Sequence, residues 1–207
     1  MEVTGICHVV GAVLGEVLPK IAPADLCIAA DAGWLALKKH GICPNLVVGD
    51  FDSSPPPAGL EAVALNPVKD ETDLYAAVRI GKERGYGDFA IYGALGGAWG
   101  HSIANFQILA GLARDGCRGK IITDDAIITS LCDGKVTLCA ENGRDVSVFA
   151  HTDTCNGVTL EGFYYPLKNA TLGSDFPLGV SNRLVEEAGK VCVDAGILIV
   201  VQEGREM

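Results

Sequence analysis

The sequence predicts an α/β fold, with an N-terminal Rossmann-like parallel sheet with helices and a smaller C-terminal all-β domain that is sandwich- or barrel-like. Up to about residue 130, short apolar runs alternate with helical patterns, which favours a parallel sheet covered by helices. After about residue 132 the helical period fades, and short runs are separated by Gly, Asn or Asp. Hydrophobic residues make up 49% of the 207 residues, which excludes intrinsic disorder and suffices for a sizeable core.

The first part contains strand-like apolar runs with helix-like stretches between them. The expected strands are residues 7–13, 26–31, 46–51, 62–65, 89–92 and 120–123. The expected helices are residues 33–40, 72–84 and 102–115, and a glycine typical of a helix end follows each of them. The second helix should bury Leu74, Ala77, Val78 and Gly81, and the third should bury Ile103, Phe106, Leu109, Ala110 and Ala113.

The second part has a different pattern, typical of antiparallel strands. Its short runs are residues 135–140, 145–150, 157–160, 190–193 and 197–201. We therefore expect an α/β domain of residues 1–132 and a β-rich domain of residues 133–207.

Charge and cysteine content narrow the class of protein. The formal net charge is −10, so a basic footprint for nucleic acid is absent. No apolar segment approaches the ~18–20 residues of a membrane span, and the N-terminus lacks the basic region of a secretory signal. The eight cysteines form no CxxC pair, which favours free thiols in a reducing cytoplasm over a zinc site or a disulfide framework.

Carboxylates follow several of the expected strands, at the edge where an open parallel sheet binds ligands. Asp31 ends the second run, and Asp50 and Asp52 end the third. In an extended segment Asp50 and Asp52 project to the same side, with Phe51 turned toward the core. Such a pair could hold Mg²⁺, which proteins bind through one or two carboxylates plus substrate phosphates. The alternative is an ordinary polar turn in which Asp50 caps a helix.

Three other short motifs also have two interpretations. Thr72-Asp73 begins a helix and could handle phosphate or simply cap the helix. A Gly-rich turn at residues 93–97 precedes the helix near His101 and could expose backbone N–H groups to phosphate, or could be only a tight turn. Ser181-Asn182 could have a functional role or could simply form a β-turn.

Together these motifs are more specific than any one of them. The series DAGW, PNLVVGDFDS, KDETDL, YGALGGAWGHSIANFQ, YPL and VSN resembles the thiamine pyrophosphokinase family over about residues 25–201. The resemblance implies an enzyme that transfers pyrophosphate from ATP to the thiamine hydroxyl with Mg²⁺, releasing AMP. It also implies a catalytic domain at residues 1–132, a thiamine-binding domain at residues 133–207, and a cytoplasmic homodimer.

The same resemblance assigns expected roles to individual residues. Asp50, Asp52 and Asp73 are expected to be the catalytic residues that bind Mg²⁺ and phosphate. The ATP side includes Asp31, Gly33, Lys69, Thr72, Gly96, Gly97 and His101. The substrate side includes Asn105, Ser181 and Asn182.

One stretch departs from the family pattern. The family reads Gly-Gly-Arg-x-Asp-His at the Gly-rich turn, whereas Ala98 and Gly100 occupy the Arg and Asp positions here. Losing a preorganised charged group commonly lowers kcat by ~10²–10³. Two alternatives therefore stay open: a pyrophosphokinase for another hydroxymethyl heterocycle, and a non-catalytic thiamine- or nucleotide-binding homologue.

Overall fold

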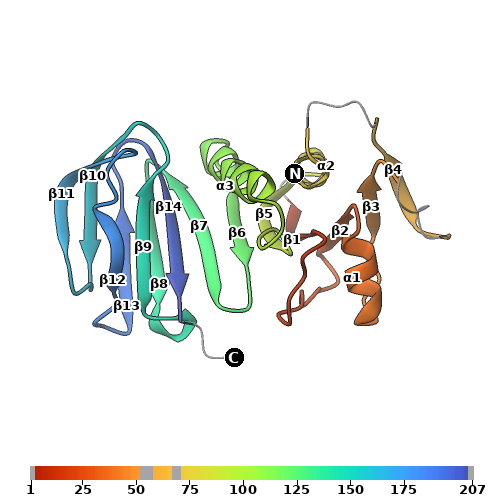
Figure 1. The fold of residues 1–207 in the computed structure, drawn as a ribbon, viewed down its shortest axis with the longest axis horizontal. Coiled ribbons are helices and arrows are strands. Elements are labelled where there is room, and N and C mark those ends of the chain that lie inside the picture. Colours follow the sequence, from red (N-terminus) through yellow and green to blue (C-terminus); the bar gives the residue numbers. More distant parts are fainter. Residues whose placement is uncertain (1–2, 52–57, 67–70, 205–207) are drawn as a thin grey trace. The chain divides into compact units, whose positions relative to one another are not determined.

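A computed structural model describes residues 3–51, 58–66 and 71–204 (Figure 1). The chain forms two compact units. Residues 1–105 and 121–123 make up unit 1, and residues 106–120 and 124–207 make up unit 2. Helix α3 (Trp99–Arg114) and strand β6 (Arg118–Ile122) each have residues in both units.

Unit 1 is built on parallel strands. Their bounds are β1 (Val3–Val10), β2 (Leu26–Ala30), β3 (Leu46–Gly49), β4 (Glu61–Ala64) and β5 (Tyr86–Tyr92). The order across the sheet is β5-β1-β2-β3-β4, and every neighbouring pair is parallel. Strands β2 and β3 are buried along their whole length, as continuous apolar runs in a parallel sheet predict.

Helices α1 (Gly33–Lys39) and α2 (Asp73–Glu83) complete unit 1 with the start of α3. The buried face of α2 contains Leu74, Ala77, Val78 and Gly81, which confirms the prediction. At Gly81 a Cβ atom would lie 2.7 Å from both the Cys7 Sγ and a ring carbon of Phe89, so this helix packs too closely for any side chain.

The predicted buried face of α3 is partly wrong. Ile103 is 59% exposed, whereas the polar residues Ser102 and Asn105 are buried. A periodicity built from apolar residues alone could not find these two positions, because buried polar side chains on a helix look like its solvent face.

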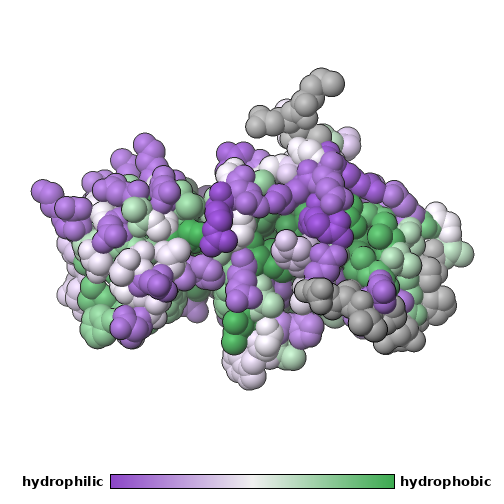
Figure 2. Space-filling view, turned by 90° about the horizontal axis from the view of Figure 1, so that it is seen from above, coloured by the Kyte–Doolittle hydropathy of each residue, from purple (hydrophilic) through white to green (hydrophobic). Residues whose placement is uncertain are grey.

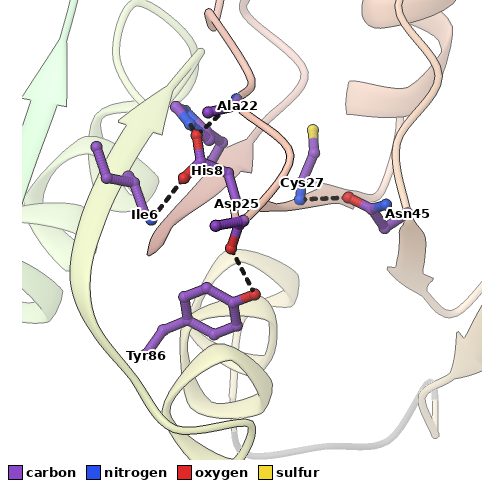
Figure 3. Close-up of polar contacts among 8 residues, drawn as sticks. Ile6, His8, Ala22, Asp25, Cys27, Asn45 and Tyr86 are labelled. Atoms are coloured by element: carbon purple, nitrogen blue, oxygen red, sulfur yellow. Dashed lines mark hydrogen bonds and ion pairs between the residues drawn. The ribbon is translucent and has the colours of Figure 1, made fainter. Parts of the chain in front are cut away.

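The interior of unit 1 contains a buried polar cluster around Asp25 (Figure 3). The Asp25 carboxylate accepts hydrogen bonds from the backbone N–H groups of Ile6 and Ala22, both at 2.8 Å, and lies 3.1 Å from His8 Nε2. Tyr86 donates its hydroxyl to the Ala24 carbonyl at 3.3 Å. These bonds tie the segment that leads into β2 to β1 and β5, and they give the mostly buried Asp25 carboxylate its hydrogen-bond partners.

Unit 2 contains two groups of antiparallel strands that enclose one core. The first has the order β12 (Gly179–Arg183), β9 (Asp145–Ala150), β14 (Ile197–Glu203) and β7 (Ala126–Cys132). The second has the order β11 (Leu167–Gly173), β10 (Thr154–Glu161), β13 (Ala188–Cys192) and β8 (Lys135–Cys139), and a short 3₁₀ helix (Ala140–Asn142) follows β8. Their inward side chains, among them Val148, Leu160 and Leu198, form the core. This is the predicted antiparallel all-β part.

Ser181 and Asn182 lie inside strand β12, so the β-turn interpretation of this pair is wrong. Ser181 has a positive φ of 59°, and the pairing register between β12 and β9 shifts between Gly179 and Asn182. The pair is therefore an irregularity within a strand. An irregularity within a strand and a β-turn favour the same residue types, so the sequence alone resembles a turn here.

The surface mixes hydrophilic and hydrophobic residues on the face drawn in Figure 2. All eight cysteines are free thiols, as expected, but only Cys7, Cys27 and Cys155 are fully buried. Among the described residues, no helix has the length and apolar character needed to span a membrane.

Candidate active site

The strand order of unit 1 places a crevice at one point of the sheet. The chain moves from β1 through β2 and β3 to β4, and then returns to the other side of β1 as β5. In open parallel sheets ligands bind where the strand order reverses, outside the carboxyl ends of the strands. The relevant loops are therefore those that follow β1 and β5.

These two loops approach each other unusually closely. Gly11 N donates to the Tyr92 carbonyl at 2.8 Å, and Val13 N donates to the Gly93 carbonyl at 3.2 Å. A Cβ atom at Gly11 would lie 2.6 Å from the Gly93 carbonyl oxygen, and one at Gly93 would lie 2.6 Å from the Gly11 oxygen. Gly93 also has a φ of 63°. Glycine at both positions is thus required by the contact that forms the base of the crevice.

A cavity of about 260 Å³ opens at this point of unit 1. Its lining combines the loops after β1, β2 and β5 with the starts of α2 and α3. The lining residues with functional side chains are Asp31, Thr72, Asp73, His101, Ser102 and Asn105.

Thr72 and Asp73 stand at the start of α2. The Thr72 hydroxyl accepts a hydrogen bond from Tyr75 N at 3.2 Å, so Thr72 is the N-cap residue. Asp73 is the first residue of the helix, where a negative charge is favoured by the helix dipole. Both also line the cavity. The capping and functional interpretations of this pair are therefore compatible.

Asn105 holds the Gly-rich turn against α3. Its side chain is 5% exposed, and its amide donates to the Ala94 carbonyl within that turn. Gly97 lines the cavity, and Gly96 lies beside it in the turn with a φ of 91°. The turn is consequently fixed from both ends, by Asn105 on one side and by the Gly11 loop on the other.

The remaining predicted residues of unit 1 are arranged differently. Asp31 directly follows β2, has a φ of 48° and lines the cavity, whereas Asp50 follows β3 and is not among the lining residues. Phe51 has a φ of 54° and packs on the core, so its side chain points inward as predicted, although the segment is not extended there. Asp52 and Lys69 lie outside the described residues.

Gly33 has a packing role in the structure. It begins α1, is buried, and a Cβ atom there would lie 2.0 Å from the Val10 carbonyl oxygen. The structure thus places it behind the cavity wall and not among the lining residues.

The donor set of the cavity suits a hard divalent cation. Asp31 and Asp73 supply carboxylate oxygens and Thr72 supplies a hydroxyl, and Mg²⁺ prefers oxygen ligands of this kind. Within residues 3–51, 58–66 and 71–204, no group of three or more His, Cys, Asp or Glu side chains is close enough to hold a metal alone. One or two carboxylates plus phosphate oxygens would match that geometry.

Ser181 and Asn182 line a separate cavity, within unit 2. It is bounded by β9, β12 and β14 and by the exposed pair Tyr164 and Tyr165, whose rings meet edge to face at 4.8 Å. The Asn182 side chain accepts from Tyr165 N at 3.0 Å and donates to the Tyr165 carbonyl at 2.7 Å. Asn182 therefore fixes the backbone that carries the tyrosine pair.

Sequence reasoning missed two parts of the site. The loop after β1, with Gly11 and Val13, contains no chemically distinctive side chain, and only the strand order identifies it. Ser102 follows His101 and was hidden by the assumption that α3 buries only apolar residues. A buried polar residue next to a predicted phosphate turn is the signal that could have found it.

Two family models match the chain. The family model described as "Thiamin pyrophosphokinase, catalytic domain" matches residues 19–121, and the one described as "Thiamin pyrophosphokinase, vitamin B1 binding domain" matches residues 135–198. The thiamine pyrophosphokinase of Bacillus subtilis (strain 168) is 30% identical over 187 residues, which is 86% of this chain and 86% of that relative.

The chain belongs to the thiamine pyrophosphokinase family. Solved thiamine pyrophosphokinase structures share its fold. The crystal structure from Bacillus subtilis has a TM-score of 0.88 at 26% identity, covering 98% of this chain and 100% of that one. The structure from Geobacillus thermodenitrificans has a TM-score of 0.85 at 26% identity, covering 96% and 97%. These likenesses confirm the predicted fold class.

Ala98 and Gly100 set this chain apart from the family pattern. Ala98 is exposed and lines the cavity. A Cβ atom at Gly100 would meet nothing within 4 Å. Both positions therefore have room for a larger side chain, and packing does not explain why they are small.

Proposed function

We propose that this protein transfers pyrophosphate from ATP to the hydroxyl of thiamine in a Mg²⁺-dependent reaction, giving thiamine diphosphate and AMP. The observation that carries the proposal is the unit 1 cavity. It combines two carboxylates, a helix N-cap and a Gly-rich turn at the strand reversal, in a chain of the thiamine pyrophosphokinase family.

The chemistry needs positioning and charge neutralisation more than covalent participation by the protein. The thiamine oxygen attacks the β-phosphorus in line, the bond from that phosphorus to the bridging α–β oxygen breaks, and AMP leaves with that oxygen. The N-termini of α2 and α3 favour negative charge in the cavity. Asp73, which begins α2 and lines the cavity, would accept the proton of the attacking hydroxyl.

The family resemblance assigns the metal ion to Asp50, Asp52 and Asp73, together with phosphate oxygens. Of these three, Asp73 lines the cavity, where Asp31 and Thr72 could supply further oxygen ligands. When bound, Mg²⁺ supplies positive charge that offsets the charge of the triphosphate. Asp31, Thr72, Gly97 and His101 would then lie along the nucleotide, since all four line the cavity. We keep Gly33, Lys69 and Gly96 as proposed residues of the nucleotide site. Because Gly33 packs against the Val10 carbonyl, it would support the cavity wall and would not contact the nucleotide directly.

Thiamine would use the cavity of unit 2. Ser181, Asn182, Tyr164 and Tyr165 border it, and the match to a vitamin B1 binding domain covers these residues. An aromatic pair beside carboxylates suits a planar cationic heterocycle. Asn105, which we first expected on the substrate side, supports the Gly-rich turn and would act through it.

A second candidate function follows from Ala98 and Gly100. A homologue that binds thiamine or nucleotide without turnover would tolerate the loss of an Arg and an Asp at these two positions. A pyrophosphokinase for another hydroxymethyl heterocycle would also keep the unit 1 cavity. It would need a different acceptor.

We also propose a homodimer in the cytoplasm. The free state of all eight cysteines supports a reducing compartment. Light scattering of the purified protein tests the dimer, and a monomer mass would contradict it.

The proposed reaction is tested by a set of omissions. Purified protein is incubated with ATP, Mg²⁺ and thiamine, and AMP is quantified. We expect AMP only when all three are present, and its loss on adding a chelator. AMP that forms equally without thiamine would contradict the proposal. AMP that forms only with another hydroxymethyl heterocycle would establish the alternative substrate.

A further inference from the structure

The unit 1 cavity has an unusual charge balance for a site that binds a triphosphate. Among its described lining residues, only His101 can carry a positive charge, whereas Asp31 and Asp73 carry negative ones. Ala98 occupies a position with space for a cation and supplies none. Within the described part of the lining, phosphate oxygens therefore depend on neutral hydrogen-bond donors as well as on a metal ion.

Ser102 is such a donor. It lies in the first turn of α3 and lines the cavity, yet it is only 7% exposed. Its hydroxyl makes no hydrogen bond to another residue in the part of the chain that the structure describes. Serines inside helices commonly bond back to the carbonyl four residues earlier. Here that carbonyl, of Ala98, accepts the backbone N–H groups of Ser102 at 3.2 Å and of His101 at 3.1 Å.

The Ser102 hydroxyl oxygen is not among the fully buried side-chain atoms that lack a partner, so it keeps some exposed surface although the residue as a whole is largely buried. Because Ser102 lines the cavity, a ligand there can accept its hydrogen bond. The site also lies at the N-terminus of a 16-residue helix that follows the Gly-rich turn, where negative charge is favoured. Both observations indicate an anion as the missing partner of Ser102.

We propose that Ser102 donates its hydroxyl hydrogen to a phosphate oxygen of the bound nucleoside triphosphate, and that this neutral donor partly replaces a cationic side chain at position 98. The inference rests on the proposed function in one respect, because it takes the triphosphate to be the ligand of this cavity. It adds a specific binding residue that the sequence motifs did not include.

The direct test is the affinity for nucleotide, measured by calorimetry with ATP and Mg²⁺. A hydrogen bond to a charged group is worth enough that Ser102→Ala should weaken ATP binding roughly ten- to a hundredfold. Ser102→Thr keeps the hydroxyl and should bind within about threefold of the unaltered protein. Binding of AMP, which lacks the β- and γ-phosphates, should change by less than about threefold in Ser102→Ala if Ser102 contacts either of those groups.

Ser130→Ala is the matched control. The Ser130 hydroxyl donates to the Leu109 carbonyl at 2.6 Å within unit 2, so this variant also loses a serine hydroxyl. It should lower the midpoint of thermal unfolding and leave ATP binding unchanged. Alanine is a better helix former than serine, so Ser102→Ala should fold. Ser102→Cys, a much weaker donor of similar size, provides a second measurement.

The outcomes separate this inference from the proposed function. Equal ATP affinity in the unaltered protein, Ser102→Ala and Ser102→Cys would overturn it, and so would an unaltered protein that binds no ATP. If the unaltered protein binds ATP but forms no AMP with thiamine, the proposed function fails. The ATP affinities of the Ser102 variants still decide whether Ser102 contacts the triphosphate. Ala98→Arg should restore at least part of the lost affinity in the Ser102→Ala background, because a cation then replaces the donor.

Discussion

The cavities of the two units use their polar side chains in different ways. In unit 2, Asn182 is committed to the backbone of Tyr165 and Arg183, and the Ser147 hydroxyl accepts from Ser181 N at 3.2 Å. In unit 1, the buried Ser102 hydroxyl has no such partner among the described residues. The unit 2 cavity is thus shaped by internal hydrogen bonds. The unit 1 cavity also has committed side chains, Thr72 and Asn105, but it keeps the Ser102 hydroxyl for its ligand. Substitutions in the unit 2 cavity should accordingly affect mainly stability, and substitutions in the unit 1 cavity should affect mainly turnover.

The largest expected effect is on turnover at the unit 1 cavity. Asp73→Asn removes the proposed proton acceptor and should lower kcat by ~10²–10³. The free energy of unfolding should change by less than ~1 kcal/mol, the value of one charge at an exposed helix N-terminus. Steady-state kinetics and urea unfolding measure the two quantities. Glu161→Gln, an exposed carboxylate of β10 outside both cavities, serves as the control. Full activity in Asp73→Asn would remove Asp73 from the mechanism.

The next prediction concerns unit 2, where a substitution should lower mainly the stability of the protein. Asn182→Ala leaves the part-buried N–H and C=O groups of Tyr165 without their partners, so the free energy of unfolding should fall by about 1 kcal/mol. The KM for thiamine should rise because the tyrosine pair is no longer held. Asn182→Asp keeps the accepted hydrogen bonds and should lose less stability. The comparison between the cavities breaks down if Asn182→Ala unfolds at the same urea concentration as the unaltered protein.

A third prediction concerns the polar cluster around Asp25, which lies in unit 1 but does not line its cavity. Burial alone would raise the pKa of the Asp25 carboxyl, but the N–H groups of Ile6 and Ala22 and the His8 side chain outweigh burial and lower the pKa. Asp25→Ala should cost about 1–3 kcal/mol at neutral pH with kcat unchanged.

The stabilising effect of Asp25 should depend on pH. Because its folded-state pKa lies below the unfolded value, the effect is present above the unfolded pKa and is lost as pH falls through the folded one. Urea unfolding of both proteins at neutral and acid pH measures this. A stability difference that grows at acid pH would contradict the assignment.

The smallest effect concerns thiol reactivity. Burial, assisted by neighbouring thiols, raises the pKa of both Cys7 and Cys27 to about 12, and only the thiolate reacts with alkylating reagents. We expect iodoacetamide to modify the exposed Cys43 and Cys139 first in the folded protein, as mass spectrometry of peptides would show. Early modification of Cys7 would indicate that the β1–α2 packing opens readily.

The sequence predicted the regular parts of unit 1 because continuous apolar runs and helix-end glycines are local signals. Strands β11 and β12 of unit 2 escaped notice, since their side chains are mostly polar or exposed. In the candidate site, Thr72, Asp73 and the Gly-rich turn were predictable from motifs. The Gly11–Gly93 contact and the buried Ser102 were not, because strand order and helix orientation arise only in the folded chain.

The most direct test of the whole account is the stoichiometry of the products. AMP and thiamine diphosphate should be quantified together after incubation of the purified protein with ATP, Mg²⁺ and thiamine. Transfer of an intact pyrophosphate predicts equal amounts of both, with no ADP and no thiamine monophosphate. ADP with thiamine monophosphate, or nucleotide binding without either product, would contradict the proposed reaction.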